Sequence, residues 1–216
     1  MADEKNETDS KGIPLKSEMP DFPPVWIFYT VMNIVFGCVG FAIAWFAAYA
    51  REAKITKADA QILLIKQFDL GWLYLGVFVL RTLQLPLSVA LGQARKDSKI
   101  ALPDQHVYKV MGAEGSKLGY VLMETEGALG DFNRAQRALM NYHENFPTIV
   151  LQYLVASFVF PFESFICISL WAVSRCMGAA GYKGSVKGRM NGMLPGIVSM
   201  FVLQGMIIIV ALKALK

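Results

Sequence analysis

Polar side chains with helical spacing stand at the beginning of the third long apolar stretch of the chain. Arg137, Asn141 and Glu144 occupy positions i, i+4 and i+7, and Arg134 lies one turn earlier. Residues at these spacings share one face of a helix. They therefore present a cation, an amide and an anion in a row about 10 Å long, because an α-helix rises 1.5 Å per residue.

A small zwitterionic ligand would match this row of groups. An arginine can hold a carboxylate through two parallel hydrogen bonds, and a glutamate can accept hydrogen bonds from an ammonium group. The same side chains could instead form an ion-pair network within the helix, facing neighbouring helices. The spacing alone leaves both interpretations open.

The composition indicates the setting in which these groups lie. Of the 216 residues, 55% are hydrophobic and only 18% are charged, and the mean hydropathy is +0.41. A soluble domain of this size could not bury so much apolar surface. The charges also cluster between long apolar runs, which is typical of a helical membrane protein.

Spanning a bilayer requires about 20 apolar residues in a helix. Five stretches of the chain are candidates for such spans: 25–50, 70–92, 132–160, 165–180 and 194–215. We therefore predict an all-α membrane protein with five spans. Residues 1–24 are predicted to be a polar, proline-containing N-terminal arm, and residues 51–69 an amphipathic segment that lies in the membrane interface.

The lysines and arginines predict the orientation. More of them flank the ends of the spans that carry the N-terminal arm, the 93–131 loop and the 181–193 loop than flank the opposite ends. The positive-inside rule therefore predicts that these three segments share the cytoplasmic face. The arm resembles neither a secretory signal nor a transit peptide, which favours the endoplasmic reticulum. A mitochondrial or plastid membrane is the alternative.

Two classes of function receive little support. The formal net charge of +4 includes no dense basic tract, so we expect no nucleic-acid partner. The cysteines Cys38, Cys167 and Cys176 lie in apolar runs without a Cys-x-x-Cys pair or a His/Cys cluster. We therefore expect neither a disulfide framework nor a metal site.

Arg81 lies in the middle of the 70–92 stretch, where a charge is costly. Such an arginine usually faces the bundle interior or a partner. We expect it to pair with a carboxylate, or with carbonyl groups that Pro86 frees, rather than to take part in catalysis.

One motif carries a family resemblance. FNRAQRALMNYHENFP, at 132–147, resembles the signature of the MAPEG family, the membrane-associated proteins in eicosanoid and glutathione metabolism. That signature reads Arg-x3-Asn-x2-Glu followed by an aromatic residue and proline. The matching residues are Arg137, Asn141, Glu144, Phe146 and Pro147.

Two further segments extend the resemblance. WAVSRCMGAAGYKGSVKGRMNG matches the family at Arg175, at Gly181 and Tyr182, and at Arg189. ARKDSKIALP more weakly resembles the basic end of the family's first helix. Residues 70–216 therefore resemble a MAPEG four-helix domain, with the type-three microsomal glutathione S-transferases as the most similar branch. The helix at 25–50 would then be an addition to the usual pattern.

The resemblance implies a homotrimer that holds glutathione between subunits near the cytosolic face. The residues that would bind the glutathione peptide are Arg95, Arg137, Asn141, Glu144 and Tyr182. Arg189 would be the catalytic residue beside the sulfur. A free thiol has a pKa of about 8.5 and is mostly protonated at neutral pH, and a neighbouring guanidinium stabilises its thiolate.

The implied function is that of a glutathione S-transferase or a glutathione-dependent peroxidase. Glutathione would be the co-substrate, and the second substrate a lipophilic electrophile or a lipid hydroperoxide in the membrane. Two positions depart from the family. Gly178 stands where well-known members carry a tyrosine, and Asn145 stands where leukotriene C4 synthase carries one.

These departures, the long 93–131 loop and the added helix keep an alternative open. The chain could instead be a non-catalytic protein with the MAPEG fold. It would then bind lipid or serve as a structural subunit of a larger membrane assembly, because a fold does not by itself imply an activity.

Overall fold

The computed structural model describes residues 13–50, 52–102, 104–108, 123–184 and 187–215. Parts of four predicted segments lie outside the described residues: the first half of the 1–24 arm, the start of the 51–69 segment, the centre of the 93–131 loop, and three positions of the 70–216 domain beyond that loop. Within the described residues there is no β-strand, and one isolated bridge joins Tyr108 to Met123.

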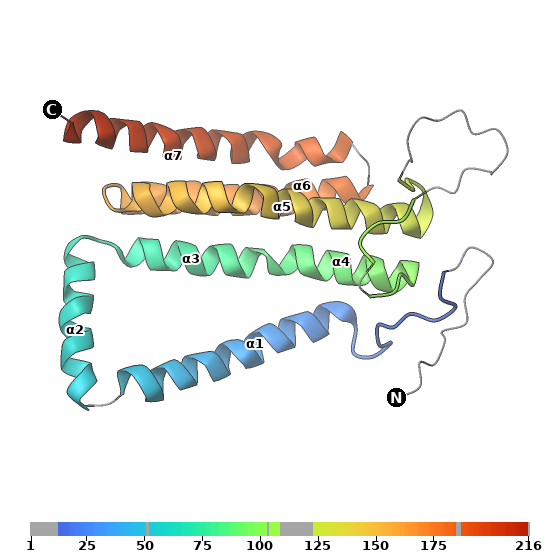
Figure 1. Cartoon of the computed structure of the whole chain (residues 1–216), viewed down its shortest axis with the longest axis horizontal. Coiled ribbons are helices and arrows are strands. Elements are labelled where there is room, and N and C mark those ends of the chain that lie inside the picture. The colour runs from blue at the N-terminus through green and yellow to red at the C-terminus, as the bar shows by residue number, and fades with distance from the viewer. Residues whose placement is uncertain (1–12, 51, 103, 109–122, 185–186, 216) are drawn as a thin grey trace.

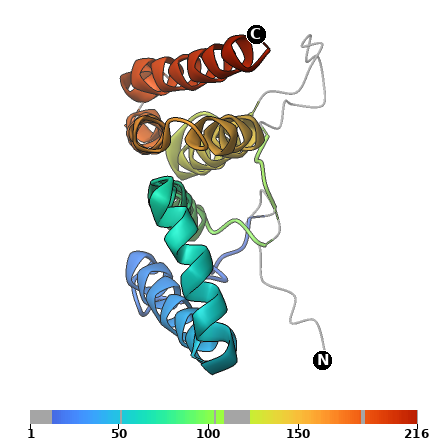
Figure 2. The same cartoon turned by 90° about the vertical axis from the view of Figure 1, so that its left-hand side faces the viewer.

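The predicted all-α class is confirmed. The elements follow in the order α1 (Val25–Ile43), the π-helix η1 (Ala44–Tyr49), α2 (Glu52–Gln67), α3 (Gly71–Leu83), α4 (Leu85–Ser98), α5 (Gly127–Ser157), α6 (Pro161–Gly184), the 3-10 helix η2 (Lys187–Gly192) and α7 (Met193–Ala214). Figure 1 shows α3 to α7 running side by side along one axis. Figure 2 shows them as layers, with α7 outermost, α5 and α6 next, and α3 with α4 beneath.

Among the described residues, four helical segments are long and apolar enough to cross a membrane: Val25–Ala47, Gly71–Ser98, Pro161–Gly184 and Lys187–Ala214. The fifth predicted span corresponds to α5, which has 31 residues and carries charged and amide side chains through its first half. Its composition therefore is less apolar than that of the four, although it runs alongside α3, α4, α6 and α7 (Figure 1).

The second predicted span is interrupted. Helices α3 and α4 continue one another but meet at Gln84, two residues before Pro86. Proline has no backbone N–H, and its ring clashes with the carbonyl group four residues earlier, which in this case belongs to Thr82. The residues that read as one apolar stretch therefore form two consecutive helices.

The core lies between α3, α5, α6 and α7. Two fully buried tyrosines of α5 tie that helix to α3. The Tyr142 hydroxyl donates to the Leu80 carbonyl at 3.0 Å, and the Tyr153 hydroxyl donates to the Trp72 carbonyl at 2.8 Å. Gly76 permits this approach, because a Cβ atom there would collide with the Tyr153 hydroxyl. Hydrogen-bonded tyrosines are the buried polar groups that an apolar core accommodates well.

The described parts of the three segments predicted to share one face lie at one end of the bundle (Figure 1). There, Lys96 at the end of α4 pairs with the Asp21 carboxylate at 3.3 Å and donates to the Pro20 carbonyl at 2.9 Å. The backbone N–H of Leu102 donates to the Glu18 carboxylate at 3.0 Å. The described part of the arm is thus bound to the α4 end, while α2 and the C-terminus lie at the opposite end.

Helix α1 contacts the bundle only near its beginning. Val25 and Tyr29 pack against Gly92 of α4, where a Cβ atom would approach Tyr29 to 2.8 Å. Beyond that point α1 diverges from the bundle, and α2 crosses back to α3 (Figure 1).

Arg81 differs from expectation. It is exposed on α3 and forms no hydrogen bond or ion pair with any described residue. The expected pairing is therefore not formed with any described residue of this chain. Arg81 therefore lies exposed on the side of a candidate membrane span, where an unpaired charge in contact with lipid is costly.

Candidate functional site

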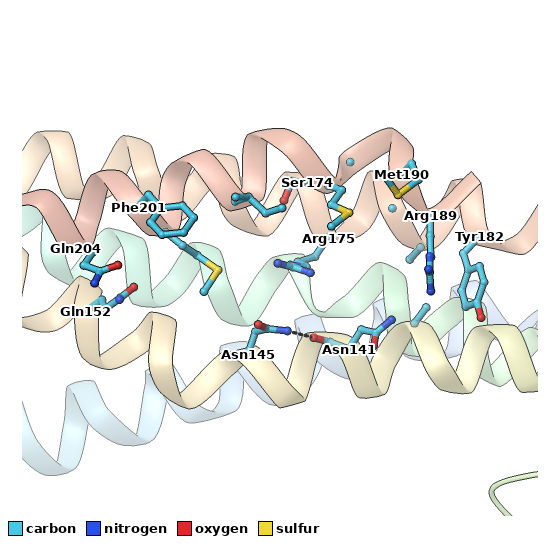
Figure 3. Close-up of a pocket in the computed structure, with 17 residues that line it drawn as sticks. Asn141, Asn145, Gln152, Ser174, Arg175, Tyr182, Arg189, Met190, Phe201 and Gln204 are labelled. Carbon is cyan, nitrogen blue, oxygen red and sulfur yellow. Dashed lines mark hydrogen bonds between the residues drawn. The ribbon is translucent and has the colours of Figure 1, made fainter. Parts of the chain in front are cut away.

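A pocket of about 640 Å³ lies between α5, α6, η2 and α7. Its polar lining consists of Asn141, Asn145, Gln152, Ser174, Arg175, Tyr182, Arg189 and Gln204 (Figure 3). The remaining walls are largely apolar and include Ile197, Met200 and Phe201. A cavity of this size with a few polar groups among apolar walls is typical of a small-molecule site.

One end of the pocket, which we call the mouth, brings together three of the residues predicted for glutathione. Asn141 comes from α5, Tyr182 from the end of α6, and Arg189 from η2. Figure 3 shows Arg189 and Tyr182 beside each other above Asn141. Arg189 forms no hydrogen bond or ion pair with a described residue, so its guanidinium is available to a ligand.

Local backbone packing places Arg189 at the mouth. The 3-10 helix folds back against α6, and Gly192 lies so close that a Cβ atom would collide with the Ser174 carbonyl and come within 2.7 Å of the Gly178 backbone nitrogen. Only glycine allows such a close approach of two backbones. The arginine three residues earlier is thereby held over the pocket.

The part of the pocket beyond the mouth, which we call the membrane half, contains polar groups that the sequence analysis did not assign to the site. Arg175 had matched the family motif without receiving a role, and Gln152 and Gln204 had not been noticed. The signal was present, because a polar residue inside an apolar span is rare and usually functional. Nε of Arg175 and Oε1 of Gln152 are buried without a hydrogen-bond partner among the described residues.

Arg137 and Glu144 pair with each other across two turns of α5. Their side chains meet at 2.8 Å, and both are exposed, at 44% and 49%. Neither lines the pocket. Within a single chain, Arg137 and Glu144 therefore form an ion pair within the helix, which is the second of the two interpretations of this motif. Their contact with a peptide stays a prediction that requires the neighbouring subunit.

The Arg95 side chain is bound to other groups of the same chain. Its guanidinium is buried, donates at 2.7 Å to the carbonyl groups of both Ala101 and Asp104, and lies 4.8 Å from the centre of the Phe132 ring. It therefore holds the turn that follows α4. It does not line the pocket, so its predicted help in binding glutathione also stays a prediction.

The two positions that depart from the family both face the pocket. Asn145 lines it and donates its side-chain N–H to the Asn141 backbone carbonyl at 2.9 Å. Gly178 lines it too, and a Cβ atom there would lie 3.4 Å from the Arg189 carbonyl oxygen, which is an ordinary contact distance. The absent side chain thus leaves open space between Arg189 and Arg175.

The described residues contain no group of three or more His, Cys, Asp or Glu side chains that could hold a metal ion. The donors in the pocket are guanidinium, amide and hydroxyl groups. Such groups suit a ligand rich in carboxylates and peptide groups.

One comparison with known proteins identifies a family. None of the curated proteins compared with the chain matches it. The family model of the MAPEG family matches residues 73–210, from the start of α3 into α7, and includes every residue that lines the pocket. Helices α1 and α2 precede the matched region. The chain therefore belongs to the MAPEG family, the membrane proteins of glutathione and eicosanoid metabolism.

Proposed function

We propose that the chain is a glutathione S-transferase or glutathione-dependent peroxidase that acts on lipophilic electrophiles or lipid hydroperoxides. The observation that carries this proposal is the mouth of the pocket. There the guanidinium of Arg189 has no partner among the described residues and stands beside Tyr182 and Asn141. A cation in that setting favours the ionised form of a thiol held next to it.

The mouth supplies what a glutathione site needs. The amide of Asn141 and the hydroxyl of Tyr182 can hydrogen-bond the peptide groups and carboxylates of the tripeptide. Lowering the thiol pKa by two units requires roughly 2.7 kcal/mol of differential interaction with the thiolate. A charge-assisted contact with Arg189 in a partly dehydrated pocket is of that order.

Two reactions follow from a bound thiolate. With an electrophile, the sulfur electron pair forms a carbon–sulfur bond, and the leaving group departs with the electrons of the bond that breaks. With a hydroperoxide, the sulfur attacks the terminal oxygen, the O–O bond breaks, and the alkoxide takes a proton. A second glutathione then displaces the hydroxyl from sulfur, giving the disulfide and water.

The second substrate would enter from the membrane. Met193 and Phe201 line the pocket and are exposed on the surface of the helical bundle. We propose the endoplasmic reticulum membrane, with the Lys- and Arg-rich end of the bundle in the cytosol. Lipophilic substrates are concentrated in such a membrane, so a lateral opening favours their capture.

We further propose a homotrimer. Arg81 and Glu144 are exposed on the lateral surface of one copy, where contact with lipid would be costly for charged side chains. A neighbouring subunit would cover them. It would also allow Arg137 and Glu144 to reach a glutathione bound between subunits, as the family resemblance implies.

A specific observation favours the second candidate, a non-catalytic lipid-binding or structural subunit of a larger assembly. Helices α1 and α2 lie outside the family match, and most of α1 is not covered by the bundle. Exposed helical surface in a membrane is available to another protein. This candidate predicts a pocket that does not bind glutathione.

One titration separates the two candidates. Purified protein is titrated with glutathione while the ultraviolet absorbance of the thiolate is followed, for wild type, Arg189→Ala and Lys187→Ala. Wild type is expected to show a thiolate signal at neutral pH. Arg189→Ala should raise the thiol pKa of bound glutathione by about two units, which cuts the thiolate fraction strongly.

Lys187→Ala is the matched control. Lys187 lies in the same 3-10 helix and carries the same charge, but it does not line the pocket. It should keep the wild-type signal. Absence of glutathione binding by wild type would rule out the enzyme and leave the non-catalytic candidate.

A further inference from the structure

Arg134 belongs to the row of polar residues at the beginning of α5, but it does not line the pocket. Its guanidinium contacts three segments of the chain instead. Nη1 donates to the Thr125 carbonyl at 2.7 Å, and Nε donates to the Lys183 carbonyl at 3.3 Å. Nη2 pairs with the Asp131 carboxylate. Arg134 therefore connects the segment before α5, α5 itself and the last turn of α6.

The backbone before α5 folds so that one of these carbonyl groups reaches the guanidinium. Gly130 lies so close to Thr125 that a Cβ atom at Gly130 would collide with the Thr125 carbonyl. The Asp131 carboxylate lies three residues before Arg134 on the same helix and fixes the plane of the guanidinium. The side chain of Arg134 is consequently only 17% exposed, which is unusual for an arginine at the end of a bundle.

The contact with Lys183 has a further consequence, because that residue lies in the last turn of α6. The last carbonyl groups of a helix have no partner within the helix and carry the negative end of its dipole. A guanidinium that donates to one of them compensates both. The start of α5 and the end of α6 lie at the same end of the bundle (Figure 1), and Arg134 is a side chain that joins them there.

The turn that Arg134 holds carries two residues of the mouth. Tyr182 directly precedes Lys183. The 3-10 helix η2 packs on the same turn, because a Cβ atom at Gly188 would collide with the Gly181 carbonyl. Arg189 follows Gly188, and Figure 3 shows it beside Tyr182.

The third residue of the mouth lies on the other helix. Asn141 follows Arg134 by seven residues on α5, which corresponds to about 10 Å along the helix axis. The distance between Asn141 and the pair of Tyr182 and Arg189 therefore depends on how α5 and the end of α6 are held together.

We propose that Arg134 is a positioning residue, which holds the end of α6 against α5 and thereby sets the geometry of the mouth. A guanidinium suits this task because its donors diverge in one rigid plane and can reach two carbonyl groups and a carboxylate together. The inference rests on the proposed function, since the mouth is where glutathione would bind. Whether Arg134 holds the end of α6 can nevertheless be measured without glutathione.

The first measurement is amide hydrogen exchange of the full-length protein in phosphatidylcholine nanodiscs, followed by mass spectrometry of peptides that cover 178–184. Arg134→Gln should exchange about tenfold faster there than wild type, because the last turn opens more often once its carbonyl loses a charged donor. Peptides from the beginning of α6, at 161–170, should exchange as in wild type. Lys187→Gln removes one positive charge from the same end of the bundle and should also match wild type.

The second measurement follows the reaction and the thiolate absorbance of bound glutathione. Arg134→Gln should lower kcat/KM for glutathione by about tenfold, because small displacements of binding groups are costly. The pH at which the bound thiol ionises should rise by about 0.5 unit or more, because Arg189 stands less well against the sulfur. KM for the second substrate should not change. Arg134→Lys keeps the charge without the planar fork and should restore part of both losses.

The two measurements together separate the possible outcomes. Weakened glutathione binding with unchanged exchange at 178–184 would overturn the proposal and make Arg134 a direct ligand of the peptide. Faster exchange with an unchanged pH profile and unchanged KM for glutathione would also overturn it, because Arg134 would then act on stability alone. If wild type binds no glutathione, the proposed enzyme fails, and faster exchange in Arg134→Gln would still support its hold on the end of α6.

Discussion

Arg95 and Arg189 lie at the same end of the bundle, yet their guanidinium groups meet opposite surroundings. At the junction of α4 and α5, Arg95 is buried, and two carbonyl groups and an aromatic ring occupy its guanidinium. In the pocket, Arg189 and Arg175 line open space and have no anionic partner among the described residues. Arg95 therefore stabilises the turn after α4, whereas Arg189 and Arg175 are available to bind a ligand.

The difference shows that the contacts of an arginine side chain within the fold, more than its position in a sequence motif, decide whether it can bind a ligand. Arg95, Arg137 and Arg189 all belong to segments that resemble the family. Of these three, Arg189 alone lines the pocket of a single chain, while Arg95 is bound to backbone carbonyl groups and Arg137 to Glu144. A cation that is already paired gains less from an additional ligand.

The largest effect that tests this comparison is on stability. Arg95→Ala should lower the free energy of unfolding by about 3 kcal/mol, because it removes two charge-assisted hydrogen bonds and leaves carbonyl groups without donors. Arg189→Ala should change it by less than about 0.5 kcal/mol, since that side chain packs against little. Unfolding followed in detergent micelles measures both. An Arg95→Ala protein of normal stability that no longer binds glutathione would place Arg95 in the site instead.

A smaller effect is expected from filling the open space between the two pocket cations. Gly178→Phe should reduce kcat/KM for bulky second substrates by about tenfold, because the ring takes up room in the cavity. Glutathione affinity should hardly change, and Gly178→Ala serves as the control for the backbone. The comparison of Gly178→Tyr with Gly178→Phe isolates the hydroxyl that other family members carry. Equal loss for small and bulky substrates would contradict a purely steric role.

The smallest effect concerns the exposed ion pair of α5. Arg137→Ala should cost less than about 1 kcal/mol of stability, as is usual for an exposed pair. A double-mutant cycle with Glu144→Ala measures the coupling energy between the two side chains. A coupling of several kcal/mol in the assembled protein would mean that a neighbouring subunit buries the pair. Glutathione affinities of the same variants show whether the pair also contacts the peptide.

The positions of the apolar helices could be read from the sequence, because a helix that crosses a bilayer needs a long apolar run. Helix α6 includes the stretch 165–180 but begins earlier and ends later than predicted. Helix α7 runs from Met193 to Ala214, within one residue of the predicted 194–215 at each end. The start of α5 was placed at 132 but lies at Gly127, because polar residues in its first turns mask the boundary. The break at Gln84 depends on the single residue Pro86, which hydropathy averages out.

The sequence by itself determined the membrane class, the order of the helices and three residues of the mouth, Asn141, Tyr182 and Arg189. These are properties of local composition and of short motifs. Only the tertiary structure decided that Arg95 and Arg137 are occupied by protein groups, and that Arg175 faces the same cavity as Gln152 and Gln204. Those residues come from different helices, and the packing of the helices sets which side chains converge and which carbonyl groups lie within reach of a guanidinium.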